Sequence, residues 1–137
     1  MREILFRGKR IDNGEWVEGN LFIPDRADAP TEICIGTNIV RITFDVIPET
    51  VGQYTKLTDK NSERIFEGDI IQFDYVGTNR GVNGVEAVVF ENGKFGVKWG
   101  WHKDLVCLDG FANTTLEVIG NIHDNPELLK GDSGNEG

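Results

Sequence analysis

Hydrophobic and polar residues alternate over short runs along most of the chain, a period typical of strands that bury one face. The clearest run is residues 84–99, GVEAVVFENGKFGVKW, with Asn92-Gly93 near its centre. Both residues tolerate the positive φ angles of a type I′ turn. The pattern therefore predicts a hairpin with one apolar and one polar face. The opposed pairs would be Phe90–Phe95, Val88–Val97, Glu91–Lys94 and Ala87–Lys98.

A second hairpin is predicted at the start of the chain, in residues 2–23, with its turn at Asn13-Gly14. Gly8 would then face Gly19, where a neighbouring side chain or backbone could approach closely. The other opposed pairs would be Ile11–Trp16, Lys9–Glu18, Phe6–Leu21 and Ile4–Ile23.

Further strands are predicted wherever an alternating run is bounded by turn residues. Residues 32–47 give two strands about Gly36-Thr37-Asn38, and Pro48 ends that run. A single helical turn is predicted at 125–129, where Asn125 can cap it and Pro126 takes the first position. The remaining strands are expected in 68–76, 104–110 and 116–122, with a flexible hairpin tip at 78–84.

Composition adds that the chain is globular and acidic. Its 137 residues, 39% hydrophobic and 27% charged, suffice for a core, and its net charge is −9. An acidic surface repels phosphate backbones, so nucleic-acid binding is disfavoured. No apolar run is long enough for a membrane span and no secretion signal is recognisable, so we expect a cytoplasmic protein.

Residues 52–73, GQYTKLTDKNSERIFEGDIIQF, concentrate polar turn residues ahead of an apolar run. Asp59 and Asn61 are predicted to form a tight turn, Gly68 to supply an unusual backbone angle, and Asp69 to accept backbone N–H bonds. The following apolar residues would enter a small SH3-like barrel. The chemical alternative is that Asp59, Glu67 and Asp69 bind a divalent metal or act as acid and base.

Other candidate chemistry in the sequence is weak. Cys34 and Cys107 have no second cysteine nearby, and Cys107, five positions after His102, does not have the spacing of a zinc site. A nucleophile pair of Cys107 with His102 or His123 would lack a recognisable third group. We expect no metal and no cofactor. Aromatic residues are more promising, because small barrels often bind peptides in aromatic-lined grooves. The candidate binding surface consists of Tyr54, Tyr75, Trp101 and His102.

Three stretches of the chain resemble the YopX-like proteins of bacteriophages and prophages. They are REILFRGKRIDNGEWVEGNLF (2–22), DVIPETVGQYTKLTDKNSERIFEGDII (45–71) and LEVIGNIHDNPELL (116–129). Lys56 and Ser62 stand where the family usually has glycine, and His123 where tyrosine is common. Ser costs more than Gly at positive φ, which counts against a type I′ turn at Ser62.

The resemblance implies a mainly β fold with an SH3-like barrel in its C-terminal part, and it brings no catalytic residues. We expect an N-terminal β region at 1–50, the barrel at 51–130 and a disordered tail at 131–137. The preferred function is a non-enzymatic phage or prophage accessory protein that binds a host or phage protein and forms a homo-oligomer. The alternative is a small metal-dependent hydrolase or nuclease using Asp59, Glu67 and Asp69.

Overall fold

The computed structural model describes residues 4–36, 41–75, 82–99 and 103–129. The fold is mainly β, as predicted, with three 3-10 turns and a helical turn at 127–129. The 3-10 turns are η1 (Pro48–Thr50), η2 (Leu108–Gly110) and η3 (Asn113–Thr115). By its internal contacts the chain divides into two compact units, Met1–Tyr54 and Thr55–Gly137.

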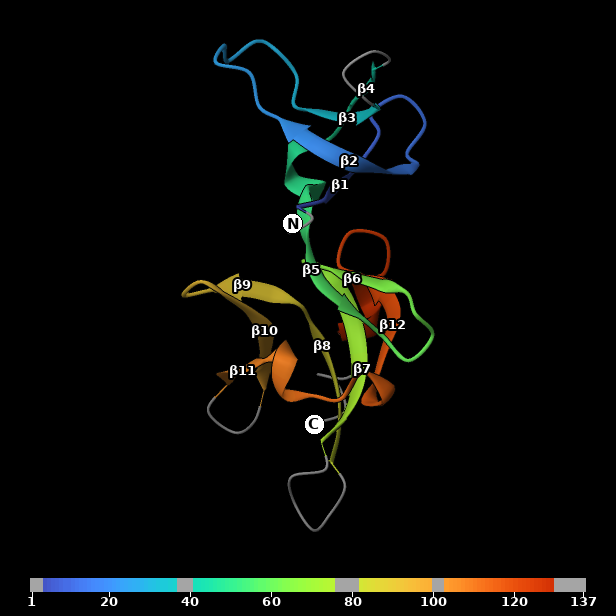
Figure 1. Cartoon of the computed structure of the whole chain (residues 1–137), viewed down its shortest axis with the longest axis vertical. Helices are drawn as coiled ribbons and strands as arrows, with labels where there is room; N and C mark the ends of the chain where they lie inside the picture. The colour runs from blue at the N-terminus through green and yellow to red at the C-terminus, as the bar shows by residue number, and fades with distance from the viewer. Residues whose placement is uncertain (1–3, 37–40, 76–81, 100–102, 130–137) are drawn as a thin grey trace. The chain divides into compact units, whose positions relative to one another are not determined.

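The first unit is a curled antiparallel sheet (Figure 1). Its strand order is β4-β3-β2-β1-β5, and an isolated bridge between Arg10 and Val46 brings the end of β1 to the end of β4. The core contains Val17, Ile33 and Val46, with four half-buried apolar side chains against them. The strands are β1 (Phe6–Lys9), β2 (Trp16–Phe22), β3 (Glu32–Gly36), β4 (Arg41–Asp45) and the start of β5 (Gly52–Thr58).

The predicted register of the opening hairpin is wrong by two residues, because its loop is longer than expected. Lys9 pairs with Trp16, and Phe6 pairs with Gly19. The amide of Arg10 donates to the carbonyl of Glu15 at 2.8 Å, so four residues form the loop, and of the Asn13-Gly14 pair only Gly14 has positive φ. A type I′ turn needs positive φ at both central residues, which explains the difference.

Glycine does allow close approaches in this sheet, although Gly8 and Gly19 do not face each other. Gly8 pairs with Val17, and a Cβ added to it would lie 2.9 Å from the Val46 side chain. A Cβ on Gly19 would lie 2.5 Å from the carbonyl oxygen of Cys34. Both positions therefore exclude a side chain.

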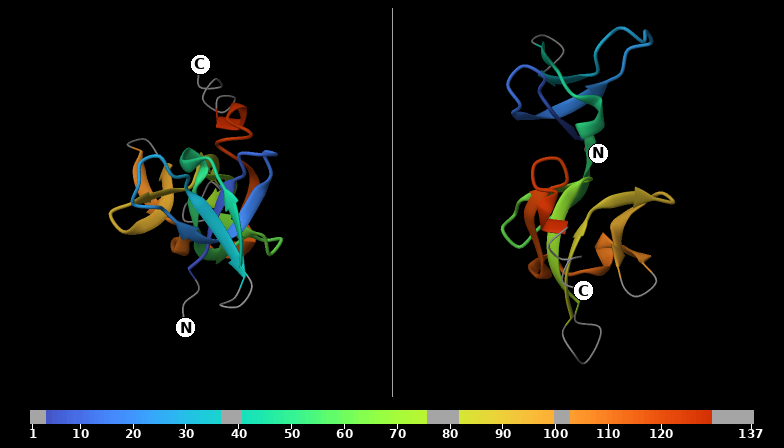
Figure 2. Two further views of the ribbon diagram at one scale, coloured as in Figure 1. Left: turned by 90° about the horizontal axis from the view of Figure 1, so that it is seen from above. Right: turned by 180° about the vertical axis from the view of Figure 1, so that it is seen from behind.

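The second unit contains two three-stranded antiparallel sheets, β12-β7-β8 and β11-β10-β9. In two views β7 and β8 lie between β12 and the other sheet (Figures 1 and 2). Seven buried apolar residues form its core. The strands are the rest of β5, β6 (Arg64–Phe66), β7 (Asp69–Tyr75), β8 (Val82–Ala87), β9 (Val89–Glu91), β10 (Lys94–Trp99), β11 (Asp104–Cys107) and β12 (Leu116–Asn121).

The hairpin about Asn92-Gly93 is confirmed, since both residues have positive φ, 52° and 77°, and Phe95 pairs with Phe90 and Lys94 with Glu91. The ladder ends at Gly96–Val89, so the predicted Val88–Val97 and Ala87–Lys98 pairs are wrong. Val88 separates β8 from β9, and Ala87 pairs with Ile70 of β7 instead.

The SH3-like barrel is not confirmed, because the described strands form separate sheets that do not close. The break at Val88 explains this, as it sends β8 and β9 into different sheets. Some predictions fall outside the described residues: the turn after Gly36, most of the 78–84 tip and the tail at 131–137. Val82–Gly84 of that tip belong to β8.

Candidate functional site

A buried carboxylate, Asp59, organises the turn between β5 and β6. Its side chain is only 1% exposed, and Oδ1 accepts the amides of Asn61 at 2.8 Å and Glu63 at 2.9 Å. Oδ2 accepts the amide of Val118, in β12, at 2.9 Å. The amide of Lys60 also donates to the carbonyl of Leu116. Asp59 therefore joins its own turn to a strand 59 residues further along the chain.

A second buried carboxylate, Asp69, lies at the next turn. Asp69 is 1% exposed, and its Oδ2 accepts the amide of Phe66 at 2.8 Å. Gly68, with φ +93°, precedes it, and the amide and carbonyl of Gly68 bond to Val88 and Ile122. These bonds attach the start of β7 to the residue that follows β8 and to the residue that follows β12.

Lys56 and Ser62 stand where the backbone conformation favours glycine. Lys56 in β5 has φ 74°, and Ser62 has φ 65°. The amide of Asp59 donates to the carbonyl of Glu63, so residues 60–62 form a three-residue loop that ends in the left-handed residue Ser62. This loop type normally places glycine at that last position, and it replaces the type I′ turn considered from the sequence.

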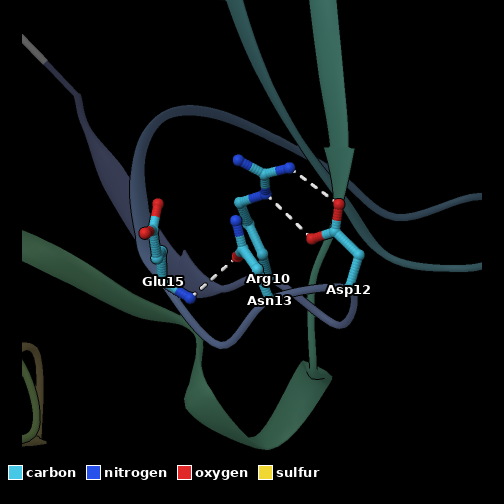
Figure 3. A network of polar contacts seen from close by, with 4 residues as sticks. All are labelled: Arg10, Asp12, Asn13 and Glu15. Carbon is cyan, nitrogen blue, oxygen red and sulfur yellow. Dashed lines mark hydrogen bonds and ion pairs between the residues drawn. The ribbon is translucent and has the colours of Figure 1, made fainter.

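In the first unit, Arg10 and Asp12 form a forked ion pair (Figure 3). Both residues line a groove. Nε donates to Oδ1 at 3.0 Å and Nη2 to Oδ2 at 2.7 Å. The hydrogen bond from Arg10 lowers the pKa of Asp12 and raises that of Arg10. The guanidinium also lies 4.4 Å from the ring centre of Phe44, which lines the groove with Thr43 and Asp45. Arg10 is therefore already engaged by two neighbours.

The second unit contains a pocket of about 370 Å³ that sequence reasoning missed. Three segments far apart in the chain form it, so no local motif could have indicated it. Its lining residues are Thr55 and Leu57 from β5, Gly93, Lys94 and Phe95 from the β9–β10 hairpin, Cys107 at the end of β11, and Leu108 and Asp109 of η2.

The aromatic surface predicted from the sequence stays a prediction. Tyr54 is half-buried in β5, where its amide donates to the carbonyl of Leu5 at 2.8 Å. Tyr75 ends β7, but its side chain is outside the described part, as are Trp101 and His102 altogether. The structure therefore does not bring these four residues together in a described site.

Two of the three carboxylates proposed for metal chemistry, Asp59 and Asp69, accept hydrogen bonds from backbone amides. Asp59 accepts three amides and Asp69 accepts at least one, and both are buried, while Glu67 is half-buried in the turn between β6 and β7. Within the described ranges no group of three or more His, Cys, Asp or Glu side chains could hold a metal ion. The backbone hydrogen bonds of Asp59 and Asp69 count against the use of these two side chains as metal ligands.

Together the fold and these sites define a small all-β protein of two units, with buried carboxylates at turns of the second unit and a pocket beside that unit's core. In the described residues no helix is long and apolar enough to cross a membrane. The chain belongs to the YopX family, since the family model described as YopX protein matches residues 5–130.

A crystal structure of protein EF1440 from Enterococcus faecalis is similar to this chain, with a TM-score of 0.57 and 25% sequence identity. The match covers 94% of this chain and 99% of that one. No curated protein matches the chain. The comparisons thus support the family and the fold, and the function has to be argued from the molecule.

Proposed function

We propose that this chain is a non-catalytic accessory protein of a phage or prophage that acts in the bacterial cytoplasm by binding protein, including a second copy of itself. The observation that carries this proposal is the apolar surface of the first unit. Of the nine large apolar side chains exposed among the described residues, seven lie in this unit. They are Ile4, Ile11, Phe22, Ile23, Ile35, Ile42 and Ile47.

The clearest part of this surface is the pair Ile35–Ile42 on neighbouring strands β3 and β4. The pair two residues along, Ile33–Phe44, belongs to the core, and Ile33 is fully buried. Because side chains two apart share a face of a strand, Ile35 and Ile42 continue the core face. They are 40% and 54% exposed.

An apolar face that continues past its own core supports a binding surface, since such patches on soluble proteins mark interaction sites. The strand at this end, β4, is also the last in its sheet order, and edge strands are places where sheets gain partners. Both features favour self-association over a freely soluble monomer.

The test measures native mass against concentration, with capture of proteins from nuclease-treated host lysate. We expect the wild-type chain to associate with itself or to retain a stoichiometric protein. Ile35→Thr combined with Ile42→Thr should weaken that association at least tenfold, because threonine keeps the strand preference and removes apolar area. Ile122→Thr, at a 38% exposed position of the second unit, is the matched control.

Two results would contradict the proposal. One is a wild-type chain that stays monomeric at every concentration and retains no protein. The other is a double variant that associates as tightly as the wild type does.

A further inference from the structure

The pocket of the second unit opens onto the hydrophobic core. Leu108 is 1% exposed and belongs to the core cluster, and Leu57 and Phe95 pack against that cluster while also lining the pocket. An apolar side chain placed there would extend the core, so its burial would be favourable in the same way as that of a core residue.

Two charges of opposite sign stand in the lining of this pocket. Lys94 and Asp109 are both exposed, and among the described residues neither takes part in an ion pair. Lys94 is paired in register with Glu91, but the Glu91 carboxylate accepts the ammonium of Lys98 at 2.9 Å. The Lys94 ammonium can therefore pair with a carboxylate of a bound molecule, and the Asp109 carboxylate with a cation of that molecule.

We propose that this pocket binds an extended segment of a partner protein in which aromatic or aliphatic residues stand between an acidic and a basic residue. The apolar side chains fill the space over Leu108, the acidic residue pairs with Lys94 and the basic residue with Asp109. Binding proteins commonly recognise such segments by burying an apolar anchor side chain in a pocket, while the surrounding contacts provide specificity. The inference rests on the proposed function, since it takes the partner to be a protein.

The half-buried free thiol of Cys107 lines the pocket, so its rate of chemical modification can report whether the pocket is occupied. Cys34, the other cysteine, lies in the first unit, so the full-length Cys34→Ser chain has a single thiol. The rate at which N-ethylmaleimide modifies Cys107 then measures how much of the pocket is occupied. The probes are two acetylated and amidated peptides, Glu-Leu-Phe-Lys and Lys-Phe-Leu-Glu, each titrated to millimolar concentration.

We expect one of the two peptides to slow the modification of Cys107 more than the other, because Lys94 comes from the β9–β10 hairpin and Asp109 from η2, two different segments of the lining. Lys94→Glu alone should weaken the preferred peptide by about twofold to fivefold, as for exposed ion pairs. Lys94→Glu combined with Asp109→Lys should reverse the preference between the peptides. The control is Lys60→Glu, the same charge change outside the pocket lining, which should leave the preference unchanged.

The inference is overturned if neither peptide protects Cys107, or if the double variant keeps the order of preference. The native mass of the same Cys34→Ser chain and its capture of proteins are measured in parallel. One outcome would refute the pocket proposal and sustain the proposed function. In that outcome the Ile35→Thr/Ile42→Thr double variant loses association, Lys94→Glu does not, and neither peptide protects Cys107. Peptide protection that follows the charges, in a chain that stays monomeric and retains no protein, would refute only the proposed function.

Discussion

Replacing Asp59 with alanine should destabilise the second unit strongly, although the residue lies in a turn. The variant removes the acceptor of three amides at once. The amide of Val118 belongs to a half-buried strand residue, and losing its partner costs about 1–3 kcal/mol. Asn61 and Glu63 are exposed, so water can replace the other two bonds at about 0.5–1 kcal/mol each. The sum is about 2–5 kcal/mol, a large part of a typical domain's stability.

Asparagine separates these contributions, because it keeps one carbonyl oxygen and replaces the other oxygen with an NH₂ group. If the oxygen stays on the turn amides, the NH₂ group faces the Val118 amide, and two donors meet. We therefore expect Asp59→Asn to be destabilised by about 1–3 kcal/mol, less than alanine, through the contact with β12 alone.

The assay is urea unfolding followed by circular dichroism, with amide hydrogen exchange read at Val118. Both variants should lower the free energy of unfolding and speed exchange at Val118. Asp104→Ala, at an exposed aspartate of β11, is the control and should change stability by less than about 0.5 kcal/mol. The reasoning is refuted if Asp59→Ala unfolds like this control, or if Val118 stays equally protected.

Three further predictions concern the turns and the packing. Ser62→Gly should stabilise the chain by about 0.5–1 kcal/mol in urea unfolding, because Ser62 has φ 65° and glycine adopts this angle without strain; equal stability of Ser62→Ala and Ser62→Gly would contradict this. Gly84→Ala should destabilise by about 1–3 kcal/mol, since an added Cβ would overlap the ring of Phe73; an unchanged melting temperature would show the site to be roomier. Asp12 should titrate below its ordinary pKa of 3.8 in carboxyl NMR, so the stabilisation by its ion pair is present above pH 4 and is lost as the pH falls through the lowered pKa. Arg10→Gln should bring that pKa back up, and a variant that titrates at the wild-type value would contradict the assignment of its cause.

Local sequence patterns predicted most elements of this fold. They failed where the register of a strand depends on hydrogen bonds that the pattern does not determine. The Asn92-Gly93 hairpin could be placed because both turn residues and the alternating flanks agree. The Asn13-Gly14 motif misled, since the same dipeptide also fits a four-residue loop, and only the bond from Arg10 to Glu15 fixes the register. A shift of two residues preserves the alternation of faces, so hydrophobicity could not detect it.

The candidate site shows the same limit. The turn expected at Asp59 and the acceptor role expected of Asp69 concern neighbours in sequence, which a pattern can indicate. That Asp59 also binds the amide of Val118 could not be predicted, because it depends on where β12 lies. The pocket joins three distant segments, and Lys94 and Asp109 have no local feature that separates them from other surface charges.

The bond from Asp59 to Val118 also bears on the order in which the chain can fold during synthesis. The buried residues of the first unit's core, Val17, Ile33 and Val46, all lie within its first third, so that core can form while the rest is still being made. The turn at Asp59 emerges soon afterwards, but its remaining acceptor oxygen has no amide to bind until Val118 is made. The second unit therefore cannot complete its fold until β12 has been synthesised. In a chain that stops before β12, the Asp59 carboxylate would lack the amide of Val118.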